Sequence, residues 1–397
     1  MPSNGALADI RVLDVTQVMA GPYCAMLLCD MGADVIKVEP PEGDSSRRMA
    51  GASTADSPSF NAVNRGKRGV VIDLKSTEGR GVFERLAASA DVLIENFRPG
   101  VMARLGLDYP RLATQNPGLI YTSISGYGQT GPKANRGGFD LVAQGVSGII
   151  SVTGEPGRIP VKAGVPITDL GAALFAVSGI LAALYHRAVR TGRGQYIDTS
   201  LVEAGVALSV WEATEYFSGV GVPGPLGSAH RMSAPYQAIR CLDGYITLGG
   251  ANDRIFRRLC DLLGHPTWAD DGDYADDTAR VRNREALAQQ IQGITEKESC
   301  RHWLDLFEAH DIPCGPINDY AAVVRDSQIQ ARGMVVETEH PTLGTIKTLG
   351  SPLKFSETPI TAGQPAPLLG QHTDAVLHEA GYDDEEIARL RDKKAVK

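Results

Sequence analysis

Three glycines are the first residues whose spacing suggests chemistry. Gly126, Gly128 and Gly131 form the pattern G-x-G-x-x-G directly after LIYTSIS, a β-branched and aromatic run that is typical of a strand. Glycines at this spacing let a chain turn tightly and let backbone amides approach a pyrophosphate. The pattern therefore suggests a dinucleotide-binding loop as a hypothesis.

The residues after the glycines do not support that hypothesis. A dinucleotide loop needs a helix immediately behind it, because the helix N-terminus faces the phosphates. Here Pro132 follows Gly131, and PKANRGG has no apolar periodicity. The first strand-helix turn, TQVMAGP, contains only Gly21. We therefore predict a glycine-rich loop at the carboxyl edge of a parallel sheet, where such folds bind ligands.

Asp169 is a second residue of interest. It precedes an apolar helical run in ITDLGAAL, and aspartate is a favoured N-cap residue. From the residues alone, we expect Asp169 to cap this helix. The helix N-terminus would then stabilise the carboxylate and keep it ionised.

The chain around these residues alternates β-rich and helical runs. Expected strands cover residues 10–15, 34–39, 69–74, 91–96, 119–125 and 195–200. Expected helices cover residues 20–33, 78–90, 100–114, 170–191 and 201–218. This alternation indicates an α/β fold whose large domain contains a Rossmann-like, doubly wound parallel sheet.

A glycine- and proline-rich segment, GVGVPGPLGS, divides the chain. It predicts a large domain at residues 1–218, a linker at 219–228 and a smaller α+β domain at 229–325. The small domain should begin with a hairpin around Asp243 and Gly244. Residues 326–397 are β-rich at first and end in a polar helix near 370–392.

Composition excludes several classes of protein. Of 397 residues, 43% are hydrophobic and 22% charged, which is ordinary for a globular protein, and the net charge of −8 argues against general nucleic-acid binding. The apolar stretch at 170–185 is short for a membrane span. No secretory signal, paired-cysteine motif or metal-ligand spacing is visible. We expect a cytoplasmic protein with no bound metal and no membrane or nucleic-acid partner.

Several long motifs carry a resemblance to a known family. They are LDVTQVMAGPYCAMLLCDMGADVIKVEPPEGD, NRGKRGVVIDLKSTEG, DVLIENFRPGVMARLGLDY, SISGYGQTGP, ITDLGAALFAVSGILAALYHRAVRTGRGQYID and PLLGQHTDAVLHEAGY. Together they resemble the class III CoA-transferases, which include formyl-CoA transferase and carnitine CoA-transferase, with α-methylacyl-CoA racemase as a relative. The resemblance implies an interlocked homodimer in which residues 326–397 return to complete the large, CoA-binding domain.

The resemblance also implies covalent catalysis. Asp169 matches the family nucleophile, which attacks the donor thioester to give a mixed anhydride and then an aspartyl-CoA thioester. Coenzyme A and its acyl thioesters are then substrates, and no permanently bound cofactor is expected. Oxyanions along this path need amide donors, and the glycine-rich loop at 126–131, which includes Gly128, would either supply them or simply let the ligand approach closely.

Further positions match the family's CoA contacts. They are Met19, Ala20, Ile72, Asp73, Leu74, Lys75, Asn96, Phe97, Arg98, Arg104, Phe139 and Asp140. At positions 75 and 104 this chain has the same type of basic residue as the family, Lys75 and Arg104, and these cations would bind the phosphates of CoA.

Departures from the family patterns limit which reaction of the family this chain could catalyse. Gly137 and Phe139 stand where formyl-CoA transferase has Lys and Tyr, and no GGGGQ loop is present. The racemase branch has a proton-transferring histidine at position 139, and phenylalanine cannot exchange a proton. GSAHRMSAPYQAI and EHPTLGTIKTLGSPLKFSETP most resemble the succinyl-CoA:glutarate type.

That type implies dicarboxylic substrates, whose second carboxylate would need a cation or several donors. Candidates are Arg47, Arg48, Arg65 and His230. Two alternatives stay open: an acyl-CoA isomerase or racemase, including intramolecular CoA transfer of the mesaconyl-CoA type, and a catalytically silent CoA-binding protein.

Overall fold

The chain folds into two compact units. The computed structural model describes residues 5–51, 57–250, 252–360 and 362–397. The large unit comprises the residues up to Ile149 together with Ala163–Phe217 and Ser327–Lys397. The small unit comprises Ile150–Lys162 and Ser218–Asp326. Each unit is described by itself below.

A six-stranded parallel sheet forms the centre of the described large unit, in the order β3-β2-β1-β4-β5-β6. Its strands are β1 (Arg11–Asp14), β2 (Asp34–Glu39), β3 (Arg68–Val71), β4 (Val92–Glu95), β5 (Ile120–Ser125) and β6 (Tyr196–Ser200). Each one lies within, or one residue from, a run that the sequence predicts as a strand, so the α/β prediction is confirmed. The order reverses between β1 and β4, and ligands bind at such reversal points in sheets of this kind.

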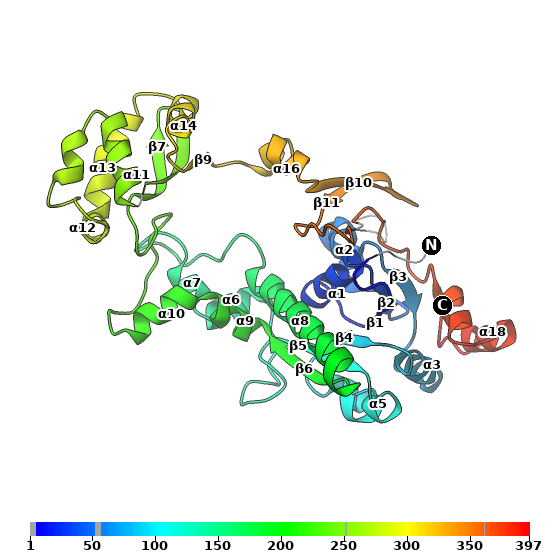
Figure 1. The fold of residues 1–397 in the computed structure, drawn as a ribbon. Coiled ribbons are helices and arrows are strands. Elements are labelled where there is room, and N and C mark those ends of the chain that lie inside the picture. Colours follow the sequence, from blue (N-terminus) through cyan, green and yellow to red (C-terminus); the bar gives the residue numbers. More distant parts are fainter. Residues whose placement is uncertain (1–4, 52–56, 251, 361) are drawn as a thin grey trace. The chain divides into compact units, whose positions relative to one another are not determined.

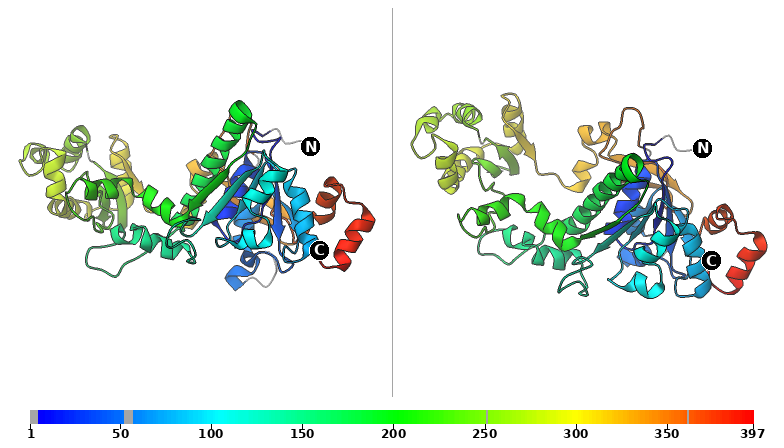
Figure 2. Two further views of the ribbon diagram at one scale, coloured as in Figure 1. Left: turned by 90° about the horizontal axis from the view of Figure 1, so that it is seen from below. Right: turned by 60° about the horizontal axis from the view of Figure 1, so that its bottom comes forward.

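Helices cover both faces of the sheet (Figures 1 and 2). Because side chains alternate along a strand, Val12 packs on one face and Leu13 on the other. The Val12 face is covered by α1 (Ala20–Asp30), α8 (Ile167–His186) and α9 (Leu201–Leu208). The Leu13 face is covered by α3 (Thr77–Ala87), α4 (Val101–Leu105), α5 (Tyr109–Gln115), α17 (Thr373–Glu379) and α18 (Asp384–Asp392).

Other elements complete the edges of the large unit. They are η1 (Ser45–Gly51), α2 (Pro58–Asn64), α6 (Asp140–Val146), the π-helical turn η2 (Arg187–Thr191), α10 (Val210–Phe217), α16 (Ser327–Ala331), β10 (Val335–His340) and β11 (Gly344–Leu349). Helix α7 (Ile149–Val152) begins at the last residue of the first segment of the large unit and otherwise belongs to the small unit. Strands β10 and β11 form an antiparallel hairpin in the region that the sequence predicts to be β-rich.

Three helices that the sequence predicts as continuous are interrupted. The helix expected at 100–114 breaks because Gly106 ends α4 at φ +71°, and α5 begins at Tyr109 with Pro110 in its first turn. The helix expected at 201–218 breaks at Ser209, whose hydroxyl bonds to the carbonyl of Gly205. The C-terminal helix breaks at Gly381, where φ is +82°, and restarts as α18.

The small unit is built on an antiparallel sheet in the order β7-β8-β9. Its elements are β7 (Tyr236–Cys241), β8 (Gly244–Gly249), α11 (Asp253–Leu262), η3 (Pro266–Asp270), α12 (Asp277–Arg282), α13 (Arg284–Thr295), α14 (Cys300–Glu308), β9 (Cys314–Pro316) and α15 (Tyr320–Val323). The predicted hairpin is present, with Cys241 paired to Gly244. Residues 150–162, assigned to the large domain from the sequence, group with this unit instead, as do residues 219–228.

One helical stretch, Ile167–Thr191, is long and apolar enough to cross a membrane by length and composition. Half of its most apolar window is buried inside the structure. Ala172, Ala173 and Ile180 of this stretch belong to the core that it shares with α1 and the sheet. The packing therefore accounts for much of its apolar character.

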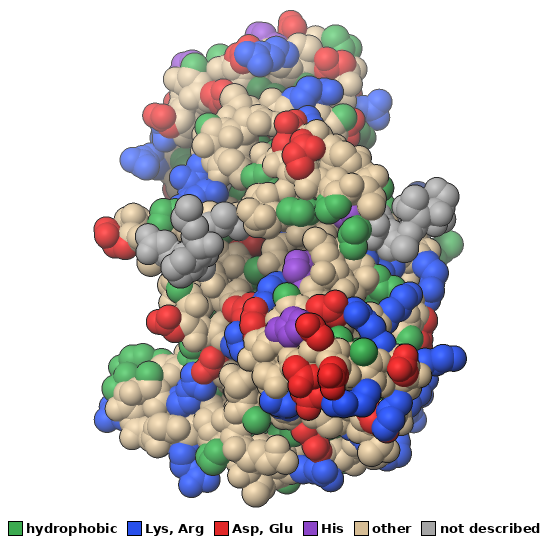
Figure 3. Space-filling view, turned by 90° about the vertical axis from the view of Figure 1, so that its right-hand side faces the viewer, with side chains coloured by type: hydrophobic (Ala, Val, Ile, Leu, Met, Phe, Trp, Pro, Cys, Tyr) green, Lys and Arg blue, Asp and Glu red, His purple; other side chains and the backbone are tan. Residues whose placement is uncertain are grey.

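The face of the large unit that carries α17 and α18 has acidic and basic side chains interspersed (Figure 3). Arg68 pairs there with Glu379 of α17 and with Asp34 of β2. These pairs connect the C-terminal helices to the edge of the sheet. The net negative charge of the chain is therefore not gathered into one acidic surface on this side.

Candidate active site

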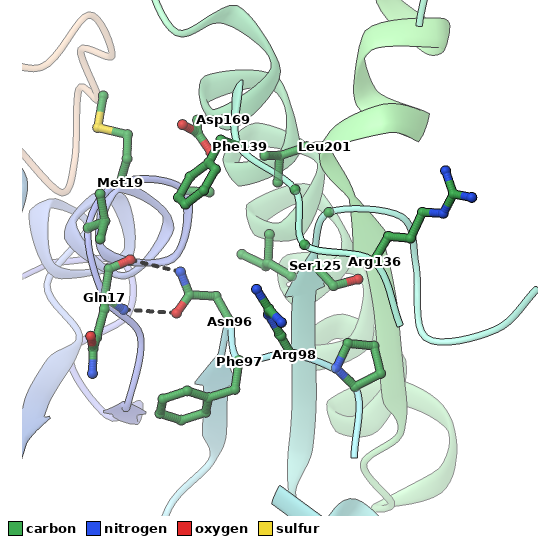
Figure 4. Close-up of a pocket in the computed structure, with 17 residues that line it drawn as sticks. Gln17, Met19, Asn96, Phe97, Arg98, Ser125, Arg136, Phe139, Asp169 and Leu201 are labelled. Atoms are coloured by element: carbon green, nitrogen blue, oxygen red, sulfur yellow. Dashed lines mark hydrogen bonds between the residues drawn. The ribbon is translucent and has the colours of Figure 1, made fainter. Parts of the chain in front are cut away.

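A cavity of about 270 Å³ lies at the point where the strand order reverses. Its wall comes from the segments after β1, β4 and β5, from the loop before α6 and from the starts of α8 and α9 (Figure 4). The lining residues are Gln17, Val18, Met19, Ala20, Asn96, Phe97, Arg98, Pro99, Ile124, Ser125, Gly126, Arg136, Gly137, Gly138, Phe139, Asp169 and Leu201. We call this cavity the reversal-point pocket.

The glycine-rich loop contributes only part of its length to this pocket. Gly126 lines it and lies against Gly138, where an added side-chain carbon would come within 2.7 Å of the Gly138 Cα. The chain after Gly131 forms turns, and the next helix, α6, begins only at Asp140. No helix begins directly after the glycines in this described stretch, and this argues against a dinucleotide loop, as the sequence indicates. Gly128 does not line the pocket.

Asp169 lies in the first turn of α8 and faces the pocket. The expectation that it caps the helix is wrong, because the helix begins at Ile167 and Pro166 occupies the N-cap position. The carboxylate of Asp169 has no hydrogen bond or ion pair with any residue that the structure describes. It is therefore a partly buried carboxylate that is open to a ligand.

The structure also contradicts the expectation that the helix N-terminus stabilises the ionised form of Asp169, because the pKa of this group is raised and not lowered. Burial, followed by the like charge of Asp140, raises the pKa of Asp169 to about 7. The neutral form of Asp169 is therefore favoured below this pKa and the ionised form above it.

Asp140 stabilises the first turn of α8 in place of Asp169. Its Oδ1 accepts hydrogen bonds from the backbone N–H of Thr168 at 3.0 Å and from the Thr168 hydroxyl at 2.7 Å. Its Oδ2 accepts a bond from the Gln144 amide at 2.6 Å. Asp140 does not line the reversal-point pocket. Its contacts instead fix the start of α8, which carries Asp169.

Asn96 holds the loop after β1 by two hydrogen bonds to the backbone of one residue. The Gln17 N–H donates to Asn96 Oδ1 at 2.8 Å, and Asn96 Nδ2 donates to the Gln17 carbonyl at 2.8 Å (Figure 4). The next residue, Val18, has φ +71°, a conformation that costs a β-branched residue free energy. The Val18 N–H donates to both carboxylate oxygens of Asp44 at 3.3 Å. The loop is therefore strained and held from two sides.

A buried network of charges lies beneath this loop. Lys37 Nζ contacts Asp44 at 3.0 Å and the carbonyl of Thr16, and Lys67 Nζ contacts Asp14 at 2.8 Å. Burial alone would raise the pKa of Asp14, but Lys37 and Lys67 outweigh burial and hold it below its usual range. These pairs connect the ends of β1 and β2 with the start of β3 and so fix the pocket floor.

Two arginines proposed from the sequence are already paired in this structure. Arg47 is buried and binds both oxygens of Glu39 at 2.7 Å and the carbonyl of Pro367 at 3.0 Å. Arg65 is buried and binds Asp30 and the carbonyl of Leu349. Neither residue lines the reversal-point pocket. Their role in binding a second carboxylate stays a prediction.

Arg98 and Arg136 are the cations that line the reversal-point pocket, and neither forms an ion pair with a described residue. Arg98 lies beside Asn96 and Ser125, whereas Arg136 points away from the other labelled side chains (Figure 4). The guanidinium of Arg98 lies over Gly137, where an added side-chain carbon would come within 2.9 Å of it. The glycine at position 137 therefore leaves room for Arg98.

A second cavity adjoins the first through the shared residues Gln17 and Phe97. Five residues proposed as CoA contacts line this second cavity, namely Ile72, Asp73, Leu74, Lys75 and the shared Phe97. Apolar side chains of Val101 and Leu105 complete it. Arg104 is exposed on α4 between these two residues and does not line the cavity.

His230 lies in the small unit. Its ring contacts Tyr236 edge-on, and its Nδ1 accepts a hydrogen bond from the backbone of Met232. These contacts are local, so a role in substrate binding stays a prediction for this residue too.

The sequence did not single out Gln17, Val18 or Arg136, all of which line the pocket. Gln17 and Val18 could have been found from their place directly after the first strand, since the carboxyl ends of parallel strands bind ligands. Arg136 had no comparable signal, because the turn that carries it has no periodicity.

Comparison with known proteins identifies the family. The model of CoA-transferase family III matches residues 7–373. The chain is 42% identical over 381 residues to succinate–glutarate CoA-transferase from Agrobacterium fabrum, which covers 94% of this chain and 95% of that protein. It is 39% identical over 387 residues to succinyl-CoA:mesaconate CoA-transferase from Haloarcula hispanica, which covers 95% of this chain and 97% of that protein.

A solved structure agrees with these similarities. The crystal structure of a CAIB/BAIF family protein from Brucella suis superposes with a TM-score of 0.84 at 39% identity, covering 95% of this chain and 100% of that chain. The chain therefore belongs to CoA-transferase family III and is an enzyme of the CoA-transferase class. The family resemblance that the sequence motifs carry is confirmed.

Proposed function

We propose that this enzyme moves coenzyme A from a dicarboxylyl-CoA donor, such as succinyl-CoA, to a free dicarboxylic acid, with Asp169 as the covalent nucleophile. The observation that carries the proposal is the Asp169 carboxylate, which faces the reversal-point pocket without a partner among the described residues. Relatives named for succinate, glutarate and mesaconate support the choice of dicarboxylic substrates.

The proposed reaction starts with the ionised carboxylate of Asp169. One oxygen attacks the thioester carbonyl of the donor, the C–S bond breaks, and a mixed anhydride and the CoA thiolate form. The thiolate then attacks the aspartyl carbonyl and releases the donor acid, which leaves an aspartyl-CoA thioester. A raised pKa suits this role, because a more basic carboxylate is a stronger nucleophile once it is ionised.

The second half of the reaction repeats these steps in reverse order. A carboxylate oxygen of the acceptor acid attacks the aspartyl thioester and expels the CoA thiolate, which gives a new mixed anhydride. The thiolate attacks the acceptor carbonyl of that anhydride, so the new acyl-CoA forms and Asp169 regains its carboxylate. Gly126 and Gly138 lie against each other at the wall of the pocket, where a side chain on either residue would push the two backbone segments apart.

Arg98 is our candidate for the second carboxylate of the substrate. It lines the same pocket as Asp169 and forms no ion pair with a described residue. Guanidinium groups bind carboxylates through paired hydrogen bonds, which a monocarboxylic acyl group cannot use. The glycine at position 137 supports this role, because a side chain there would displace the guanidinium.

We also infer that the enzyme acts as a homodimer in the cytoplasm, as the family resemblance implies. Large apolar side chains on α8 and α10 support a subunit contact: Leu174 is 52% exposed, Trp211 is 56% exposed and Phe217 is 81% exposed. Light scattering should give twice the mass of one chain. A monomeric mass in an enzyme with full activity would contradict the dimer.

The test of the function uses succinyl-CoA with a panel of free mono- and dicarboxylic acids, and new CoA esters are followed by mass. Asp169→Asn should lower transfer by at least about a thousandfold while CoA binding remains measurable. Hydroxylamine added with the donor should convert Asp169 into a hydroxamate. Asp198→Asn is the matched control, because Asp198 is another carboxyl group with a raised pKa but lies outside the pocket. Normal turnover without the label would contradict the covalent mechanism.

An intramolecular reaction is the second candidate, because a relative transfers CoA to mesaconate, which has two non-equivalent carboxyl groups. In that case one acyl-CoA incubated alone should rearrange, and free acids should not change the rate. Racemisation is less well supported, because Phe139 offers no exchangeable proton at the pocket.

A further inference from the structure

A third cavity, of about 570 Å³, lies at the C-terminal end of the described chain. It is lined by Pro41, Asp73, Arg391, Lys394, Val396 and Lys397. Asp73 also lines the second cavity, and Gln17 and Phe97 connect that cavity to the reversal-point pocket. Shared lining residues therefore relate the three cavities in order, from the one that contains Asp169 to the one that contains the C-terminal lysines.

Backbone pairing fixes the C-terminal segment beside the second cavity. Val396 forms an antiparallel bridge with Ile72, and the Asp73 N–H donates to the Ala395 carbonyl at 2.9 Å. Ala395 and Val396 are buried. The flanking residues Lys394 and Lys397 are exposed, so their side chains remain free to meet a ligand in the third cavity.

Three basic side chains and one acidic side chain line the third cavity. Lys394 and Lys397 form no ion pair with a described residue, whereas Arg391 is bound to Asp374 at 2.5 Å. The acidic group on the wall is Asp73, whose Oδ1 accepts a hydrogen bond from the Lys75 N–H. Two unpaired cations on the rim of a cavity in a chain of net charge −8 point to an anionic ligand group.

The connected cavities match the parts of coenzyme A in order. The thioester belongs at Asp169 under the proposed function, on which this inference rests. The adenine suits the second cavity, where Leu74, Phe97 and Leu105 offer apolar surface. The remaining end of the molecule is the ribose 3′-phosphate, a phosphomonoester that carries close to two negative charges at neutral pH.

We propose that Lys394 and Lys397 bind the 3′-phosphate of coenzyme A. The C-terminal segment thereby becomes part of the substrate site, and the Ile72–Val396 bridge places it there. A binding role of these lysines can be distinguished from a purely structural role of the segment. Only a binding role predicts that the lysines raise the affinity for coenzyme A more than the affinity for 3′-dephospho-coenzyme A. These two ligands differ only in the phosphomonoester.

The experiment measures the affinity of the full-length enzyme for both ligands by calorimetry, at low salt and at 0.5 M salt. The double variant Lys394→Gln/Lys397→Gln should bind coenzyme A about tenfold more weakly and dephospho-coenzyme A with little change. High salt should reduce the difference between the two ligands in the wild type. Lys393→Gln is the matched control, because Lys393 is one residue away and pairs with Glu78 at 2.7 Å.

The affinities for the two ligands test the lysine assignment and the proposed transferase function separately. Equal losses for both ligands, or no loss for either, would overturn the lysine assignment and leave the proposed transferase function intact. Wild-type enzyme that binds neither ligand would overturn the proposed function and this inference with it. Thermal unfolding of each variant shows whether it is folded, and both lysine side chains are exposed, so folding should be unaffected.

Discussion

Replacing Asn96 by alanine should lower activity far more than it lowers stability. The substitution removes both hydrogen bonds between the Asn96 amide and the backbone of Gln17. It leaves Val18 at φ +71° with only the two long bonds to Asp44 as described contacts of its amide. The loop that forms one wall of the reversal-point pocket should then relax away from its present conformation.

The size of the effect follows from these contacts. Two backbone hydrogen bonds contribute about 1–3 kcal/mol together, and a β-branched residue in the left-handed region costs about 1–3 kcal/mol. Losing the bonds therefore leaves the strain of Val18 roughly unopposed. A loss of about 2 kcal/mol in the preorganised loop corresponds to about a 30-fold fall in kcat/KM.

Asn116→Ala provides the matched control. Asn116 Nδ2 also donates two hydrogen bonds to backbone carbonyls, those of Ala87 and Ala90, at 3.0 and 2.7 Å. Asn116 lies outside all three cavities described above. Asn116 Oδ1 also accepts a hydrogen bond from the Gly118 N–H at 3.2 Å, so Asn116→Ala should lose at least as much free energy of unfolding in urea as Asn96→Ala. Only Asn96→Ala should lose kcat/KM with succinyl-CoA.

A second substitution separates loop positioning from a direct contact to CoA. Val18 is 38% exposed, so Val18→Gly removes little packing and relieves the backbone strain. In the Asn96→Ala background it should recover part of the lost kcat/KM. Asn96→Ala with kcat/KM within twofold of wild type would refute the reasoning. So would a full loss that Val18→Gly does not change, because Asn96 would then act on the ligand itself.

The remaining predictions concern charge at and beneath the pocket. The rate of donor attack should rise with pH through about 7, since the raised pKa leaves Asp169 protonated below that value. Asp140→Asn removes a like charge, so it should move the acid limb of the pH–kcat/KM profile to lower pH; a limb that does not move would exclude Asp140 as a cause. Gly137→Ala should displace Arg98 and lower kcat/KM about tenfold for succinyl-CoA but little for acetyl-CoA; equal losses would contradict a carboxylate contact. Lys67→Met should cost about 3–5 kcal/mol of unfolding free energy, because it leaves buried oxygens without their cation; a loss under about 1 kcal/mol in urea titration would contradict that account.

Much of the fold could be predicted from local sequence. The six strands of the large unit are short β-branched runs bounded by turn residues, and the structure places a strand at each one. The order of the strands could not be predicted, because pairing depends on contacts between distant segments. The breaks at Gly106 and Gly381 were missed for a related reason. Glycine is tolerated inside a helix, so its left-handed conformation becomes certain only when neighbouring packing requires it.

The site was predictable in position but not in its electrostatics. Family motifs directed attention to Met19, Asn96, Arg98, Phe139 and Asp169, and the structure brings all five to one pocket. Their chemical roles remain predictions.

The state of each charged group depends on a partner that the family motifs do not indicate. Arg47 is bound by Glu39 and Arg65 by Asp30, pairs that no motif indicates. The raised pKa of Asp169 likewise depends on burial and on Asp140, which approaches through the fold.

If Asp169 is the nucleophile, as we propose, the arrangement at the start of α8 accounts for a reactive carboxylate near a helix N-terminus. A helix N-terminus favours an anion through its free N–H groups. Here the side chain of Asp140 takes the N–H of Thr168, so no described donor reaches the carboxylate of Asp169. Hydrogen bonds to a nucleophile must weaken as its charge moves to the substrate, and that loss raises the barrier. A carboxylate without such bonds avoids the loss, at the expense of a pKa near 7. Asp140 thus has two effects on the nucleophile: it removes a competing donor, and its charge makes the carboxylate more basic.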